Sequence, residues 1–191
     1  MSSSLNDIKH RKALAWAAFW KLDRIWKAKY IPVQLKINIF KTTVLTIFTY
    51  GCECWIVKPS DESSINAFAT SCYRILLGVK RLDKVTNVEI YQRSAQIPLM
   101  STIRARQLRW IGHLLRRDKN GPARELAFYE PHTSLGKAKR GQPAITYKHQ
   151  IASMLTSRPE LLTTAAIETM ASDRNKWRKL VVECSGAIEW W

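Results

Sequence analysis

The sequence lacks the compact motifs that most enzymes use to hold metal ions, phosphates or a nucleophile. It contains no adjacent aspartates, no Gly-x-x-x-x-Gly-Lys-Ser/Thr loop, no Gly-x-Ser-x-Gly turn and no His-Glu-x-x-His helix. Seven glycines and seven prolines in 191 residues leave little material for glycine-rich phosphate loops and allow long helices. We therefore predict no catalytic residue and no bound cofactor in this chain, and a stand-alone enzyme is the least favoured hypothesis.

Cysteine is also scarce, and its spacing matches neither a disulfide framework nor a zinc site. Four cysteines in a chain of this length are too few to staple a disulfide-rich domain. Cys52 and Cys54 are separated by one residue, whereas paired zinc ligands are usually separated by two to four. We predict no bound metal, and we interpret Cys72 and Cys184, which lie on apolar helical faces, as core residues.

Long hydrophobic runs are missing as well. The most apolar stretch, residues 37–57, contains Lys41 and Glu53 and is too short and too charged for a good membrane span. The polar and then basic beginning, MSSSLNDIKHRK, does not look like a secretory signal. We expect an intracellular protein, nuclear or cytoplasmic, with no membrane partner.

Positive charge, by contrast, is abundant and lies in two blocks. The chain holds 31 Lys and Arg against 15 Asp and Glu, a formal net charge of +16. Residues 1–41 carry nine basic and two acidic residues, and residues 100–148 carry eleven and three, whereas residues 149–191 carry five of each. Because such an excess favours a polyanionic partner, we predict that the chain binds RNA and DNA.

Apolar residues recur at a spacing of three to four almost throughout, which predicts an all-α fold of about seven or eight helices. We expect two domains: a thumb-like helical bundle over residues 1–97, and a second layer over residues 98–191 that contains a basic helix, a basic loop and the C-terminal helices. β-Branched residues near Val44–Tyr50 make a strand the alternative to a helix there. The expected helices lie near residues 5–28, 32–50, 61–77, 87–95, 101–117, 122–128, 146–155 and 163–184, the last with a break near Ser172.

Residues 101–117, STIRARQLRWIGHLLRR, form the most informative of these helices. On a helical wheel the apolar residues share one broad face, and the segment contains no acidic residue. An ordinary solvated face is the alternative, although it would usually include glutamates for i,i+4 pairs. Guanidinium groups bind two phosphate oxygens at once, unlike a Lys ammonium. We predict phosphate contacts by Arg106, Arg109, Arg116 and Arg117, and a mobile clamp formed by Lys137, Lys139 and Arg140.

Several short motifs also occur in the order typical of one family. They are Tyr50–Trp55 (YGCECW), Arg74–Val79 (RILLGV), Asp83–Glu89 (DKVTNVE), Pro98–Leu99, Arg106–His113 (RQLRWIGH), Arg140–Pro143 (RGQP) and Asp173–Trp177 (DRNKW). Spanning about residues 10–182, they resemble the region after the polymerase palm in RTE-type endonuclease–reverse transcriptases of LINE elements, which are non-LTR retrotransposons. The resemblance implies a thumb and post-thumb helical region that holds template RNA and primer, with the catalytic residues outside this chain.

Charge and resemblance together favour one function over a second. The first hypothesis is a nucleic-acid-binding, C-terminal part of a LINE-type RNA-directed DNA polymerase, itself without a catalytic centre. The alternative is a helical protein-interaction module that docks on the polymerase palm. Exposed Phe, Trp or Leu side chains on the first two helices would favour the alternative.

Overall fold

The computed structural model describes residues 4–117, 121–128, 147–155 and 164–186. Within these ranges every regular element is a helix and no strand forms, which confirms the all-α prediction. Contacts divide the chain into two units. Unit 1 contains the residues up to Cys52 together with Val57–Ile103, and unit 2 contains Glu53–Ile56 together with the residues from Arg104 onward.

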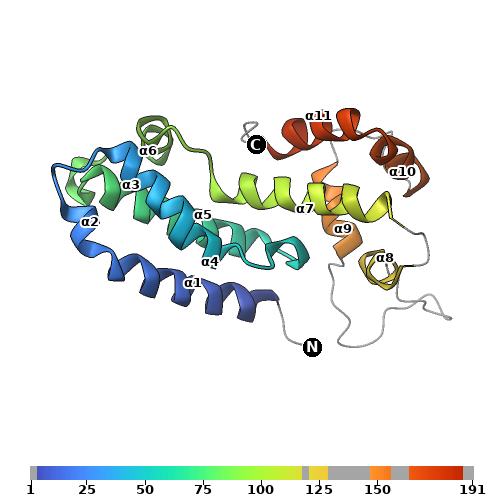
Figure 1. Ribbon diagram of the computed structural model, residues 1–191, viewed down its shortest axis with the longest axis horizontal. Helices are drawn as coiled ribbons and strands as arrows, with labels where there is room; N and C mark the ends of the chain where they lie inside the picture. The colour runs from blue at the N-terminus through green and yellow to red at the C-terminus, as the bar shows by residue number, and fades with distance from the viewer. Residues whose placement is uncertain (1–3, 118–120, 129–146, 156–163, 187–191) are drawn as a thin grey trace. The chain divides into compact units, whose positions relative to one another are not determined.

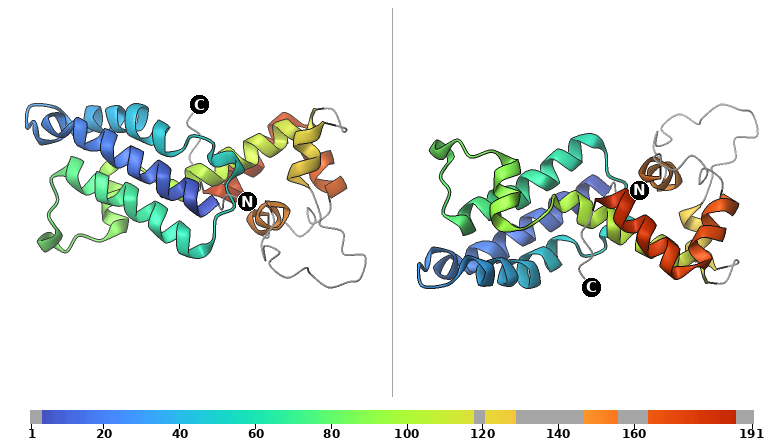
Figure 2. Two further views of the ribbon diagram at one scale, coloured as in Figure 1. Left: turned by 90° about the horizontal axis from the view of Figure 1, so that it is seen from below. Right: turned by 90° about the horizontal axis from the view of Figure 1, so that it is seen from above.

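Unit 1 is a bundle in which α1, α3 to α4, and α5 lie side by side (Figures 1 and 2). Its helical segments are α1 (Ser4–Lys21), α2 (Asp23–Lys27), α3 (Val33–Ile39), the π-helix η1 (Phe40–Leu45), α4 (Thr46–Phe48), α5 (Pro59–Leu77) and α6 (Asn87–Ser94). Short 3₁₀ turns, η2 (Cys52–Cys54) and η3 (Arg81–Asp83), lie in the connections. Aromatic rings fill the core: Phe68 stacks on Phe48 with ring centroids 4.8 Å apart and meets Trp16 edge-on at 5.0 Å.

The predicted helix over residues 5–28 is interrupted at Leu22, which separates α1 from α2. The buried Trp26 is the physical reason. Its indole N–H donates to the Phe19 carbonyl at 2.7 Å, and the Leu22 amide donates to the same carbonyl at 3.1 Å. These two donors occupy the acceptor that a continuous helix would offer to the amide of Asp23.

The segment Val44–Tyr50, for which a strand was the alternative, is helical as far as Phe48. It belongs to one continuous run in which α3 passes into the π-helical η1 and then α4. Threonine hydroxyls along this run donate back to carbonyls one turn earlier, as Thr43 does to Ile39 at 2.6 Å and Thr46 does to Thr42 at 2.9 Å. Such back-bonding lets β-branched residues sit in a helix, although it bends the backbone.

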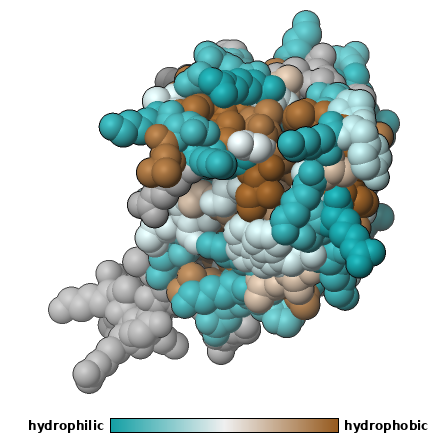
Figure 3. All heavy atoms as spheres, turned by 90° about the vertical axis from the view of Figure 1, so that its left-hand side faces the viewer, coloured by the Kyte–Doolittle hydropathy of each residue, from teal (hydrophilic) through white to brown (hydrophobic). Residues whose placement is uncertain are grey.

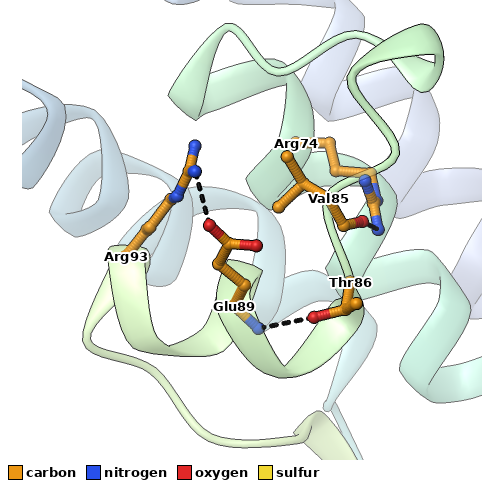
Figure 4. A network of polar contacts seen from close by, with 5 residues as sticks. All are labelled: Arg74, Val85, Thr86, Glu89 and Arg93. Atoms are coloured by element: carbon orange, nitrogen blue, oxygen red, sulfur yellow. Dashed lines mark hydrogen bonds and ion pairs between the residues drawn. The ribbon is translucent and has the colours of Figure 1, made fainter.

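Side chains and one glycine determine the ends of α5 and α6. Gly78 ends α5 with φ of 68°, as expected of a glycine after a helix. The Thr86 hydroxyl accepts the Glu89 amide at 3.2 Å and so caps α6 (Figure 4). The Glu89 carboxylate pairs with Arg93 at 2.5 Å. The helix α5 begins at Pro59, two residues before the expected residue 61, and the Asp61 carboxylate in its first turn accepts the Lys58 amide at 3.4 Å.

Unit 2 contains most of α7 (Leu99–Leu115), with α8 (Pro122–Ala127), α9 (Tyr147–Met154), α10 (Thr164–Ser172) and α11 (Arg174–Ser185). The predicted break near Ser172 is confirmed, because Asp173 caps a new helix there by accepting the amides of Asn175 and Lys176 at 2.9 and 3.0 Å. The helix α7 begins two residues earlier than predicted, since the Asn66 side chain accepts the Met100 amide at 3.0 Å. It also ends two residues earlier, at Leu115.

Candidate nucleic-acid interface

The helices α7 and α11 approach each other closely at Gly112 (Figure 1). A Cβ atom at this position would lie 2.1 Å from Nε1 of Trp177, so only glycine fits beneath the indole. The same indole N–H donates to the Leu108 carbonyl at 2.9 Å. These contacts fix one face of α11 on α7, and they determine which side chains of the two helices become neighbours.

The crossing gathers arginines from both helices into what we call the arginine surface: Arg106, Arg109, Arg116, Arg174 and Arg178. Loss of water contact lowers the pKa of Arg109 from its ordinary value, and the neighbouring cations of Arg106 and Arg178 lower it further. Desolvation, and then the nearby Arg174, also lower the pKa of Arg116. Desolvation is the larger cause of both shifts, and the smaller, Coulombic causes mean that like charges face one another, because arginines stay protonated in proteins. An anion bound here would relieve this repulsion.

Two carboxylates of unit 2 are engaged elsewhere. Glu168 forms an ion pair with Arg124, which also donates to the Leu115 carbonyl at 3.3 Å. Asp173 accepts two backbone amides and lies 3.6 Å from Lys176. Among the residues that the structure describes, no carboxylate forms an ion pair with Arg109, Arg174 or Arg178. These three arginines therefore give the arginine surface an excess of positive charge within the described residues.

The apolar face predicted beneath the arginines is confirmed, because Ile103, Ile111 and Leu114 are all buried. The arginines themselves differ. Arg109 is exposed and Arg106 is half-buried. Arg116 follows the end of α7 and donates to the Ala171 carbonyl at 2.8 Å, so it also holds α10 in place.

The remaining predicted residues lie away from the helix. Arg117, also beyond the end of α7, is exposed and lines a cavity of about 370 Å³ with Leu114 and α8. The prediction placed Arg116 and Arg117 on the helix, but both follow its last residue, Leu115. Lys137, Lys139 and Arg140 fall outside the described residues, so their role as a clamp stays a prediction.

Sequence reasoning missed Arg174 and Arg178. Both lie in residues 149–191, where basic and acidic residues balance, so counting by segment concealed them. A local signal was available. The two arginines are four residues apart and flank Trp177 on an amphipathic helix, so they share a face at its edge.

A second feature of unit 2 is an apolar cavity of about 290 Å³. Its lining comes from four segments: Cys54, Trp110 of α7, Ala123, Leu126 and Ala127 of α8, and Tyr147 of α9. Trp110 and Tyr147 meet edge to face, with ring centroids 5.8 Å apart and ring planes at 83°. The Tyr147 hydroxyl donates to the Glu53 carbonyl at 2.7 Å, which fixes its ring.

A buried polar triangle holds the cavity wall together. The side-chain amides of Gln107 and Gln150 both donate to the Trp55 carbonyl, at 2.9 and 3.1 Å, and the Gln150 amide also donates to Oε1 of Gln107 at 3.0 Å. Buried amides that satisfy one another fix a unique arrangement. Here they tie α7, α9 and the segment that contains Cys54 into one frame.

Three further observations concern other kinds of site in the described residues. No group of three or more His, Cys, Asp or Glu side chains there has the arrangement of a metal site. None of the four cysteines, all of which are described, forms a disulfide; Cys52 and Cys72 are buried in the core, whereas Cys184, predicted as a core residue, is half-buried. No described helix is long and apolar enough to cross a membrane.

No protein-family model matches the chain, and no solved structure matches it. Among curated proteins, the chain is similar to an uncharacterised transposon-derived protein of Caenorhabditis elegans, with 23% identity over 182 residues. The similar region includes 92% of this chain but 63% of that protein, so the chain spans less than two thirds of its relative. The similarity supports a transposon-related origin for the chain.

Proposed function

We propose that this chain is a nucleic-acid-binding part of a LINE-type retrotransposon protein, and that it holds template RNA or primer through phosphate contacts. The single observation that supports the proposal best is the arginine surface, where cations from α7 and α11 face one another. Within the described residues, no carboxylate forms an ion pair with Arg109, Arg174 or Arg178 of this surface. Phosphates are the natural counter-ions for such a surface. Contacts of this kind position a strand without reading its sequence, so we expect little sequence preference.

The nature of the parent protein is part of the same proposal. The ordered motifs resemble the region after the palm of RTE-type reverse transcriptases, and a transposon-derived relative agrees with that origin. We propose that the parent is an RNA-directed DNA polymerase with its endonuclease and palm in other segments. The purified chain is accordingly expected to bind RNA and DNA but to synthesise no DNA.

A salt titration of binding tests the phosphate contacts. Fluorescence anisotropy with labelled RNA and DNA strands at several salt concentrations gives the slope of log affinity against log salt. If about four to seven phosphates are neutralised, the slope should be roughly −3 to −6. Changing Arg109 and Arg178 to Gln should flatten the slope by about one to two units, because each arginine releases roughly one counter-ion. Arg116 is left intact because it also holds Ala171.

The matched control removes two charges at a different place. Lys27 and Arg93 are exposed residues of unit 1, and each pairs with a carboxylate one turn away, Asp23 and Glu89 respectively. Their change to Gln lowers the net charge by the same amount and should leave the slope nearly unchanged. A slope near zero for the unmodified chain, or equal slopes for both double variants, would remove the phosphate-binding proposal.

A second candidate function is docking on another protein, such as the polymerase palm of the parent. It is favoured by exposed apolar side chains of unit 1: Leu14 and Trp20 on α1, Tyr30 in the turn between α2 and α3, and Val33 and Leu35 on α3. Figure 3 shows hydrophobic residues among hydrophilic ones on the face of unit 1 that contains the turn between α2 and α3. Binding through such a surface would not weaken as salt rises, which distinguishes it from phosphate binding.

A further inference from the structure

We propose that the cavity lined by Trp110 and Tyr147 takes an unpaired nucleobase of the strand that the arginine surface holds. This inference rests on the proposed function and deepens it, because it assigns the ligand as single-stranded nucleic acid. The six lining side chains carry no formal charge, so the cavity suits a flat, uncharged group rather than a phosphate. Phosphates and bases alternate along a strand, and Arg106 of the arginine surface lies four residues before the Trp110 that lines the cavity.

The position of Trp110 on α7 supports this assignment. Residues three and four apart on a helix are neighbours, so Arg106 lies one turn before Trp110 on the same side, and His113 lies nearly one turn after it. A base held against Trp110 would therefore have a flanking phosphate within reach of Arg106, one member of the arginine surface. Aromatic side chains next to cationic grooves are the usual means of holding single strands without sequence preference.

The cavity is both preformed and accessible. Tyr147 is fixed by its bond to the Glu53 carbonyl, and the glutamine triangle fixes the backbone behind Cys54. At the rim, Leu126 is 75% exposed although it is a large apolar residue on the short helix α8. A base that enters the cavity would cover Leu126 and lie against the rings of Trp110 and Tyr147. The volume of about 290 Å³ is close to the lower end of ordinary ligand pockets.

The test compares two single strands that differ only in their bases. One is a short labelled oligothymidylate, and the other is an abasic strand of equal length with the same number of phosphates. We expect the parent chain to bind the oligothymidylate more tightly. Trp110→Ala should weaken that binding by about 5- to 150-fold, the range measured for loss of one stacked base, and should leave the abasic strand unaffected. Trp110→Phe keeps a flat ring and should retain most of the preference.

Leu126→Ala provides a second variant that does not threaten folding, because the side chain is exposed. It should reduce the preference for the oligothymidylate by a smaller factor. Equal binding of the two strands by the parent would overturn the cavity proposal while the phosphate contacts stand. If neither strand binds, the proposed function falls as well, so the two failures are distinguishable.

Cys54 offers a direct footprint of the cavity. It is exposed and lines the cavity, whereas Cys52 and Cys72 are buried. In a Cys184→Ser background, alkylation by a maleimide therefore reports on Cys54. Loss of water contact and the Glu53 carboxylate raise the pKa of the Cys54 thiol, so labelling should be followed at mildly alkaline pH.

The oligothymidylate should slow this labelling, and the abasic strand should not. Equal labelling rates with both strands would assign the cavity to another occupant, such as an apolar side chain of a partner protein, and would overturn the proposal.

Discussion

At the scale of single residues, a few side chains determine where the cations of unit 2 lie. Trp177 donates to the Leu108 carbonyl, and Gly112 leaves room for its ring. Neither residue carries charge, yet together they set the distance between the arginines of α7 and α11. Arg116 shows the opposite case, since a predicted phosphate ligand also donates to the Ala171 carbonyl. The sequence identified charged residues readily, but it did not identify which of them have a second, structural contact.

The change Gly112→Ala tests the close approach of the two helices. The new methyl group would meet the buried Trp177 ring at 2.1 Å, and overpacking of this kind costs about 1–3 kcal/mol. Alanine would otherwise stabilise a helix by about 1 kcal/mol relative to glycine. We expect a net decrease in the free energy of unfolding, measured by urea denaturation. His113→Ala, at the exposed neighbouring position, is the control and should not destabilise. A Gly112→Ala variant as stable as its parent would mean that the helices are not in contact here.

At the scale of elements, the sequence predicted helices well where one apolar stripe determines them. The helix near residues 61–77 was expected from the spacing of its apolar residues, and Ile65, Phe68 and Leu76 of α5 are all buried. Errors occurred where a distant side chain replaces a local backbone bond. Trp26 ends α1 by binding the Phe19 carbonyl, and Asn66 starts α7 two residues early. These contacts join residues between 7 and 34 positions apart, beyond the reach of a local pattern.

The cap of α11 yields a prediction on pH. The backbone amide of Lys176 donates to the Asp173 carboxylate and lowers its pKa below the ordinary value of 3.8; desolvation opposes this shift, and the Asn175 amide and the nearby Lys176 charge add to it. A carboxyl group with a lowered pKa in the folded state stabilises that state above its unfolded pKa, and this stabilisation is lost as pH falls through the folded pKa. Asp173→Ala should therefore be less stable than the parent at pH 7. The difference should shrink below about pH 4 as the parent's carboxylate is protonated.

Urea denaturation from pH 7 to pH 2 measures this difference. Asp173→Asn keeps a capping oxygen without the charge, so it should lie between the parent and the alanine variant at pH 7. A difference between parent and Asp173→Ala that does not change with pH would show that the cap does not depend on the charged carboxylate.

At the scale of the whole chain, net charge and candidate site were only partly predictable. The excess of +16 and its concentration in residues 100–148 pointed to α7. The contribution of α11 was hidden, because its arginines are balanced in sequence by carboxylates that the fold uses elsewhere, as Asp173 does at the cap. The cavity could not be predicted either, since its lining joins positions from Cys54 to Tyr147. Charge balance along a sequence thus differs from charge balance on a surface.

The same charge should make the stability of the free chain depend on salt, in the direction opposite to its binding. An excess of +16 repels itself in the folded state, and added salt screens that repulsion, because the Debye length falls from about 30 Å at 0.01 M to about 8 Å at 0.15 M. The apparent melting temperature should therefore rise with sodium chloride, by roughly 2–4 °C for each kcal/mol of repulsion relieved. Differential scanning fluorimetry measures this rise.

Changing Arg109 and Arg178 to Gln removes two cations from the arginine surface, so this variant should melt higher than the unmodified chain at low salt and gain less from added salt. The control change of Lys27 and Arg93 to Gln breaks two ion pairs and should not raise the melting temperature. A melting temperature that falls with salt, or a parent and an arginine variant with the same salt dependence, would mean that the arginines are neutralised within the fold, and the surface would then have no excess charge to offer a nucleic acid.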